Sequence, residues 1–357
     1  MRTYLSSLRG WRLCLTWYAF LLLLSHLTIW LFESPVPPDQ EATRQIALKT
    51  IDENGQRTNE NAIINYKDIS GDTGASQPVV FLLPGGPEGP GVFDQMIPEL
   101  RNEFRLIIPH LPGNLSRGES LPDYSFGALA DYSRQLAAAL DIPRIHLVGF
   151  GLGGASAIHW AHNDTARIQS VTLISSIGVQ ELELLGGHTL NHAVYGMQLA
   201  AVWLLHNAVP HFGLFNALNI NVPYAKSYYE SDQRPIRSYL RSYEKPMLIL
   251  HGSEDPLVPD AIAREHHRIV PQSIMQLYDA DHNLTETHSE SVANDLGLFV
   301  NKVENGNAPT IADATDERLA EADTPFSNVD FAKFEGISLL IILLIIILFT
   351  FISEDLA

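Results

Sequence analysis

The sequence has almost no cysteine and comparatively few positive charges. Cys14 is the single cysteine among 357 residues, so the chain cannot form an internal disulfide. Lysine and arginine total 23 against 41 acidic residues, which gives a formal net charge of −18 at pH 7. A surface this acidic repels the phosphates of nucleic acid and of anionic lipids, so we expect no nucleic-acid partner. The sequence also lacks internal repeats.

Long, uncharged apolar runs are confined to two segments. Residues 14–32 are long enough to cross a bilayer as a helix, with arginines before them and acidic residues after them. The positive-inside rule therefore predicts a signal anchor, with residues 1–13 in the cytoplasm and the following chain on the non-cytoplasmic, periplasmic or extracytoplasmic side. A cleaved signal peptide is the alternative, although "FESPVPP" is a poor cleavage site. Residues 337–352 predict a second transmembrane segment, with a buried core helix as the alternative.

The chain between these segments divides by composition. Residues 33–44 form a proline-rich stalk, and residues 303–332 an acidic linker whose small residues predict a flexible tether. From 45 to 302, short apolar runs alternate with helical patterns, which predicts an α/β fold with a doubly wound, mostly parallel sheet. The predicted strands are 79–83, 106–108, 145–150, 171–174 and 247–250, after a hairpin formed by 45–51 and 63–69. The insertion from about 178 to 245 predicts a helical cap over the carboxyl ends of the strands.

A glycine-rich segment, "GFGLGG" at 149–154, joins one predicted strand to a predicted helix. This is the setting of a nucleophile elbow, G-x-S-x-G, but Gly151 stands at the position of the serine. Glycine adopts the positive φ of such a turn at no steric cost. The sequence therefore predicts an elbow whose geometry persists while its nucleophile position is vacant.

Residues 45–302 resemble the α/β-hydrolase superfamily through five segments that follow one another in the order of that family. They are "FLLPGGPEGPGVF" at 81–93, "LIIPHLPGNLSRGES" at 106–120, "LVGFGLGG" at 147–154, "LILHGSEDPLVP" at 248–259 and "DADHNL" at 279–284. The resemblance implies an α/β-hydrolase fold with a helical cap, flanked here by two transmembrane helices, and a hydrolase of ester-type bonds if the protein is active.

The same resemblance implies roles for residues near Gly151. Asp255 matches the acid, with Glu254 as the alternative, and His282 matches the general base that would take a proton from the nucleophile. The backbone N–H of Leu152, together with that of Gly85 or Gly86, would form the oxyanion hole. No cofactor or metal is expected. His188 and His192 stand four residues apart, but no third metal ligand is apparent.

Three functions remain open from the sequence. The first is a membrane-anchored pseudo-enzyme that lacks serine-hydrolase turnover and binds a small ester- or lipid-like ligand. The second is an active hydrolase that uses water activated by His282 and Asp255, or a displaced nucleophile; the candidate hydroxyls belong to Ser156, Ser175, Ser176 and Ser253. The third is an accessory domain of a membrane transport or scaffold protein. It rests on "FISEDLA" after the second apolar segment, which resembles the start of the DedA-like membrane proteins and would imply a missing C-terminal membrane domain.

Overall fold

Eight strands form one sheet at the centre of the molecule. In the computed structural model, the described residues are 2–32, 43–71, 77–86, 89–111, 121–217 and 221–324. The strands are β1 (Thr43–Ile51), β2 (Arg57–Ile69), β3 (Val79–Leu83), β4 (Arg105–His110), β5 (Ile145–Phe150), β6 (Ile168–Ile174), β7 (Met247–Gly252) and β8 (Ile274–Tyr278). Their spatial order is β1-β2-β4-β3-β5-β6-β7-β8. Within this sheet β2 pairs antiparallel with both β1 and β4, and the other neighbours pair parallel.

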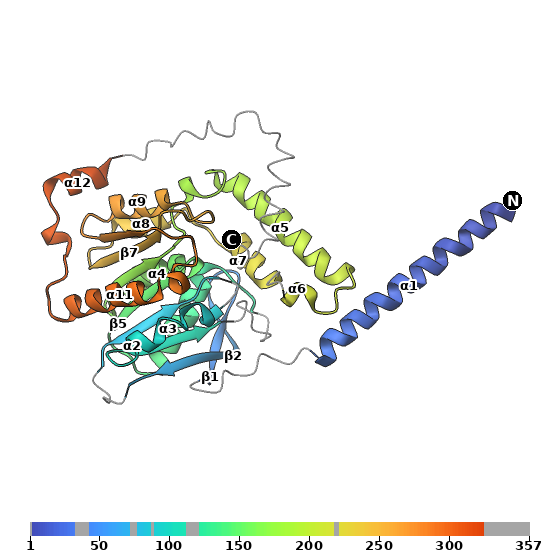
Figure 1. Ribbon diagram of the computed structural model, residues 1–357, viewed down its shortest axis with the longest axis horizontal. Helices are drawn as coiled ribbons and strands as arrows, with labels where there is room; N and C mark the ends of the chain where they lie inside the picture. The colour runs from blue at the N-terminus through green and yellow to red at the C-terminus, as the bar shows by residue number, and fades with distance from the viewer. Residues whose placement is uncertain are drawn as a thin grey trace.

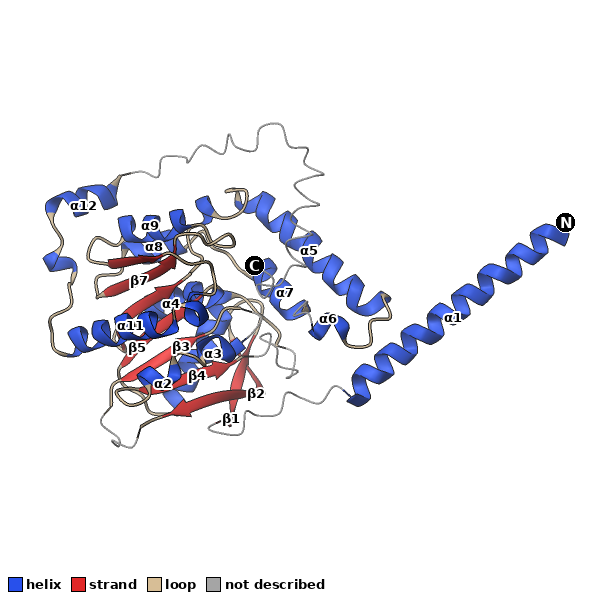
Figure 2. Ribbon diagram, in the orientation of Figure 1, coloured by secondary structure: helices blue, strands red, loops and turns tan. Residues whose placement is uncertain are grey.

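Helices cover both faces of the sheet, as Figure 2 shows. One face packs against α3 (Phe126–Ala139), α4 (Leu152–Asn163), α8 (Ile236–Arg241) and α9 (Asp260–Ile269). The other face packs against η1 (Gly89–Phe93), α2 (Ile97–Leu100) and α11 (Ser289–Glu304), and α10 (Leu284–Thr287) lies beside η1. Strands β5 and β7 are buried along their whole length because helices cover them on both sides. The predicted α/β class and mostly parallel sheet are confirmed.

A group of helices between β6 and β7 extends beyond the sheet (Figure 1). It consists of η2 (Gln180–Leu182), α5 (His188–Ala208), α6 (Leu214–Ala217) and α7 (Val222–Glu230), and α5 contacts α7. We call these elements the cap. The predicted insertion continued to residue 245, but α8 contacts α4 and α9, and its Ile236 and Leu240 belong to the core beside the sheet. The insertion therefore returns to the sheet earlier than the composition indicated.

Helix α1 (Arg2–Phe32) projects from the body of the molecule (Figure 1). Its segment Gly10–Phe32 is the one helix of the described ranges that is long and apolar enough to cross a membrane. A signal sequence has the same length and apolar composition, so this helix suggests an anchor without determining the topology of the following domain. The predicted second transmembrane segment, 337–352, lies outside the described residues.

Two segments differ from the sequence-based expectation. The edge strand β8 was not predicted, because its residues "IMQLY" are only partly buried and carry a polar glutamine, Gln276. The predicted acidic tether contains η3 (Ile311–Asp313) and α12 (Asp316–Asp323). Helix α12 contacts α9, and the Arg318 guanidinium donates to the carbonyl of His267. Over these residues the chain is helical and packed on the domain, which corrects the expectation of a flexible tether.

Candidate functional site

The turn between β5 and α4 has the geometry of a nucleophile elbow. Gly151 has φ 52° and ψ −120°, a region that residues with a side chain adopt only under strain. Its N–H donates to the carbonyl of Ile174 at 3.1 Å, and its own carbonyl accepts from Ile177 at 3.3 Å. These bonds tie the turn to the end of β6. The elbow is therefore present, and the residue at its tip has no side chain.

Gly85 brings the loop after β3 into contact with this elbow. A Cβ built on Gly85 would lie 2.1 Å from the carbonyl oxygen of Phe150 and 2.3 Å from the backbone nitrogen of Leu152. Only glycine permits that approach, because atoms at such distances overlap. Leu152 begins α4, where the first backbone N–H groups lack partners within the helix. Gly86 is buried, and its carbonyl accepts from Gly89 at 3.2 Å. Gly85 and Leu152 thus lie beside the elbow, while the oxyanion-hole role of these residues and of Gly86 remains a prediction.

Asp255 and His282 meet at the carboxyl edge of the sheet. His282 Nδ1 lies 2.8 Å from Asp255 Oδ2, and both side chains are buried. Asp255 Oδ1 accepts two further hydrogen bonds, from the backbone N–H groups of Leu257 at 2.9 Å and Val258 at 2.8 Å. A carboxylate only accepts, so Nδ1 of a neutral imidazole carries the proton and Nε2 is the basic nitrogen. Glu254, the alternative acid, is exposed.

The basic nitrogen of His282 faces the elbow. A Cβ built on Gly151 would lie 3.7 Å from His282 Nε2 and 3.8 Å from the carbonyl carbon of Gly85, which is ordinary van der Waals contact. A serine hydroxyl at this position could therefore reach hydrogen-bond distance of Nε2. Among the described residues beyond its two chain neighbours, no other atom lies within 4 Å of that position. The sequence-predicted residues Gly151, Asp255 and His282 converge, and the space for a nucleophile is open.

The alternative serines lie at other places. Ser175 follows β6 with φ 43°, is fully buried, and its hydroxyl has no hydrogen-bond partner among the described residues. Ser176 donates to the carbonyl of Ile177 at 2.7 Å, and Ser253 is exposed. Ser156 is on α4 and lines a pocket described below. None of them stands at the tip of the elbow, although the strained Ser175 lies next to the residue whose carbonyl accepts from Gly151.

A second histidine supports the acid, and the sequence reasoning missed it. His251 lies on β7, and its Nε2 donates to the carbonyl of Val258 at 2.8 Å and lies 3.5 Å from Asp255 Oδ2. Burial lowers the pKa of His251, which keeps its ring neutral. The bond to Val258 closes the loop that carries Asp255. A histidine four residues before the acid was the available sequence signal.

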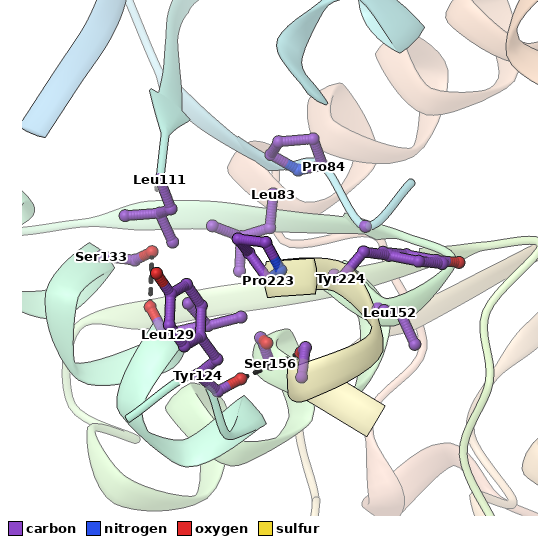
Figure 3. Close-up of a pocket in the computed structure, with 13 residues that line it drawn as sticks. Leu83, Pro84, Leu111, Tyr124, Leu129, Ser133, Leu152, Ser156, Pro223 and Tyr224 are labelled. Carbon is purple, nitrogen blue, oxygen red and sulfur yellow. Dashed lines mark hydrogen bonds between the residues drawn. The ribbon is translucent and has the colours of Figure 1, made fainter. Parts of the chain in front are cut away.

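A small pocket adjoins the elbow, with Leu152 of α4 in its lining (Figure 3). Its wall comes from the end of β3, from α3 and α4, and from α7 of the cap. The lining residues are Leu83, Pro84, Gly85, Leu111, Tyr124, Leu129, Ser133, Leu152, Gly153, Ser156, Pro223, Tyr224 and Ser227. Most of this surface is apolar, with hydroxyls from serines and tyrosines. The lining therefore favours a small, largely apolar group.

The histidine pair on the cap packs against its neighbours, and no third metal ligand joins it among the residues that the structure describes. The rings of His188 and His192 stack at 5.7 Å, and His192 also stacks on Tyr229 at 4.4 Å. In the described part of the chain, no group of three histidine, cysteine or acidic side chains could hold a metal ion. The stacked arrangement is a packing feature of α5 and α7.

Comparison with known proteins agrees with the fold. Residues 78–205 match a family model described as the alpha/beta hydrolase fold. A thermophilic esterase from Thermogutta terrifontis is similar in structure, with a TM-score of 0.57 over 73% of this chain and 99% of that one, at 19% identity. The protein has the α/β-hydrolase fold. This confirms the resemblance seen in the sequence at the level of the fold.

Relatives of this α/β-hydrolase-fold protein include enzymes and uncharacterised proteins. An uncharacterised protein of Mycobacterium tuberculosis is 31% identical over 104 residues, which are 29% of this chain and 30% of that protein. A 2-hydroxy-6-oxo-2,4-heptadienoate hydrolase of Pseudomonas putida is 24% identical over 263 residues, covering 62% of this chain and 90% of the enzyme. The chain thus matches under a third of the length of its first curated relatives.

Proposed function

We propose that the protein is a membrane-anchored α/β-hydrolase-fold protein that binds a small ester- or lipid-like ligand without forming an acyl-enzyme. One observation carries the proposal: Gly151 holds the elbow conformation, and it has no hydroxyl to attack a carbonyl. No serine oxygen of the described residues lies within 4 Å of the position that a Cβ of Gly151 would take. The two chain neighbours of Gly151 are Phe150 and Leu152, which carry no hydroxyl. Covalent serine catalysis at this position is therefore impossible.

The pocket beside the elbow supports ligand binding. Leu152 and Gly85 line it beside the elbow. Pro223 and Tyr224 of α7 line it from the cap (Figure 3). A carbonyl group of the ligand would lie near the N-terminus of α4, where backbone N–H groups and the helix dipole favour partial negative charge. The apolar wall would hold the hydrocarbon part.

Helix α1 supports the membrane anchoring. Its segment Gly10–Phe32 has the length and composition of a span, and Arg12 at its start contrasts with the acidic residues after it. The proposal therefore keeps residues 1–13 in the cytoplasm and the α/β-hydrolase domain on the non-cytoplasmic side.

A second candidate function is hydrolysis by activated water. The intact pair of Asp255 and His282 favours it, because His282 Nε2 faces a space that glycine leaves open. A water there could donate its proton to Nε2 and attack the carbonyl carbon of an ester. The imidazolium formed would be stabilised by the Asp255 carboxylate. It would return the proton to the alkoxide as the ester C–O bond breaks, which releases an alcohol and a carboxylic acid.

Labelling with a fluorophosphonate probe tests the first proposal. The full chain, in detergent micelles, should not be labelled, because no hydroxyl stands at the elbow. Gly151→Ser should be labelled at residue 151, since His282 can activate the new hydroxyl. Serine in this positive-φ turn costs about 1–3 kcal/mol of strain, so the reaction can be slow.

Controls separate the proposal from its alternatives. Labelling of the unmodified chain that disappears in His282→Ala would overturn the proposal in favour of a displaced nucleophile, and Ser175→Ala and Ser156→Ala would then locate it. Hydrolysis of p-nitrophenyl esters by the unlabelled, unmodified chain, lost in both His282→Ala and Asp255→Asn, would instead establish water activation. If the unmodified chain is neither labelled nor hydrolyses the esters but still binds apolar esters, the result supports the proposed binding function.

A further inference from the structure

The cap is unusual in its charge. From Leu184 to Ala225 the sequence has no aspartate, glutamate, lysine or arginine, although such residues make up 18% of the chain. This uncharged stretch includes α5, α6 and the first residues of α7. A cap exposed to water on its outer side normally carries charged side chains there. The absence of charge indicates that something other than water covers part of it.

Large apolar side chains are exposed where α5 ends and the chain turns into α6. The exposed fractions are 54% for Trp203, 56% for Leu204, 37% for Val209, 47% for Phe212 and 56% for Leu214. We call these five residues the cap tip. Apolar side chains gathered in this way on a surface mark a site of contact with a membrane or a partner.

The cap tip is joined to the candidate membrane span by hydrogen bonds. The buried hydroxyl of Ser25 on α1 accepts from the backbone N–H groups of His211 at 3.0 Å and Phe212 at 2.8 Å. The Tyr18 hydroxyl donates to the carbonyl of Ala208, and His26 Nε2 lies 3.3 Å from the carbonyl oxygen of Asn207. These contacts fix the position of the cap tip along α1.

The position of Ser25 gives the depth of the cap tip. Ser25 precedes the end of α1 at Phe32 by seven residues, which at 1.5 Å per residue is about 10 Å along the helix. Interfacial helices bury their apolar face about 5–10 Å below the membrane surface. A cap tip hydrogen-bonded at this level of a membrane-spanning helix therefore lies inside the apolar layer.

We propose that the cap tip inserts into the same bilayer that α1 crosses, in the leaflet that faces the α/β-hydrolase domain. The inference rests on the proposed anchoring by α1. We expect the lipid around the cap tip to have no net charge, as in phosphatidylcholine. The cap tip offers no charge to a headgroup, and the net charge of −18 on the chain disfavours anionic lipid. The cap thereby becomes a second membrane contact beside the anchor.

Tryptophan quenching in vesicles tests this insertion. The full chain with Trp11, Trp17 and Trp30 changed to phenylalanine retains two tryptophans, Trp203 in the cap tip and Trp160, which is buried in the core. It is reconstituted in phosphatidylcholine vesicles whose acyl chains carry bromine. We expect the Trp203 signal, taken as the difference from the same chain with Trp203→Phe, to be quenched about twofold, as for a ring in the acyl layer.

A second chain reports on the anchor alone. It keeps Trp17 and carries Trp203→Phe, so quenching of Trp17 establishes that α1 is in the bilayer. Quenched Trp17 with unquenched Trp203 would overturn the insertion of the cap tip while leaving the anchor intact. If Trp17 is not quenched, the proposed anchoring by α1 is overturned. Unquenched Trp203 accompanied by a dimer in crosslinking would assign the cap tip to a second copy of the chain.

Two exposed leucines provide a matched pair of variants. Leu204→Asp places a charge on the cap tip and should abolish the quenching of Trp203. Leu298→Asp places the same charge on α11, where Leu298 is 53% exposed, and should leave the quenching unchanged. Both sites are open to solvent in the structure, so neither substitution disturbs the core. Equal quenching in both variants would contradict the proposal.

Discussion

The two sides of the site differ in what holds them in place. The elbow side, from Gly85 to Gly151, keeps its shape through backbone contacts so close that a single Cβ at Gly85 would overlap them. The acid–histidine side keeps a buried carboxylate and imidazole that are joined by a hydrogen bond. A buried polar pair of this kind is weak evidence for stability, because desolvation offsets much of its attraction. Close backbone contacts account for the shape of the elbow. The pair of Asp255 and His282 is the part of the site on which the proposed ligand or water depends.

The largest expected effect comes from breaking the acid–histidine side after the elbow has been repaired. In the Gly151→Ser chain, His282→Ala should slow labelling by the fluorophosphonate about 10²–10⁴-fold, because the hydroxyl loses its general base. The labelling rate is followed by gel fluorescence. Ser253→Ala in the same chain is the control, since Ser253 is exposed, and should leave the rate unchanged. Equal rates with and without His282 would mean that the two sides are not coupled.

A smaller effect is expected from disturbing the elbow side. Gly85→Ala should lower the free energy of unfolding by about 1–3 kcal/mol or more, because the new methyl group overlaps the backbone of Phe150 and Leu152. Gly187→Ala is the matched control, since a Cβ there meets nothing within 4 Å. Denaturant titration of both variants measures the difference. Equal stability of the two would show that the loop after β3 can move away from the elbow.

The smallest expected effect is on the pH dependence of stability, and it concerns His266, which among the described residues lacks the kind of partner that His282 has in Asp255. His266 on α9 is fully buried with neither ring nitrogen bonded to a described residue, and burial lowers its pKa to about 3. The unfolded chain binds a proton near pH 6.5 and the folded chain does not, so the stability contributed by neutral His266 is lost as the pH falls below about 6.5.

His266→Met should remove this acid sensitivity. Between pH 7 and pH 5.5 we expect the variant to lose about 1 kcal/mol less stability than the unmodified chain. Leu298→Met, at an exposed side chain that does not titrate, is the control and should retain the original slope. Melting temperatures across this pH range provide the measurement. A parallel slope for His266→Met would mean that the buried ring is protonated in the folded state.

The sequence predicted those parts of the molecule that depend on local pattern. Strand β3 is apolar throughout and β5 is apolar apart from His146, and their predicted bounds are those of the structure. The order of the glycine turn, Asp255 and His282 was readable from the family resemblance, in which the segments 147–154, 248–259 and 279–284 follow one another. Their convergence still required the fold, because Gly151 and His282 are far apart in the chain.

Features that depend on tertiary contacts were not predictable. Helix α12 is acidic and has little to bury, and its place follows from contacts with α9, such as that of Arg318 with His267. The return of α8 to the core depends on Ile236 and Leu240 meeting α4. The support of Asp255 by His251 depends on the path of the loop after β7. The uncharged stretch of the cap was visible in the composition, but its contact with α1 was not.

Helix α7 joins two features of the molecule, since Pro223, Tyr224 and Ser227 line the pocket while the helix also contacts α5. With the cap tip in the bilayer, the pocket stands at the membrane surface rather than in bulk solvent. A ligand that partitions into lipid then approaches by lateral diffusion. Its occupancy depends on its mole fraction in the leaflet, so dilution with empty vesicles should weaken binding even at a constant total amount of ligand.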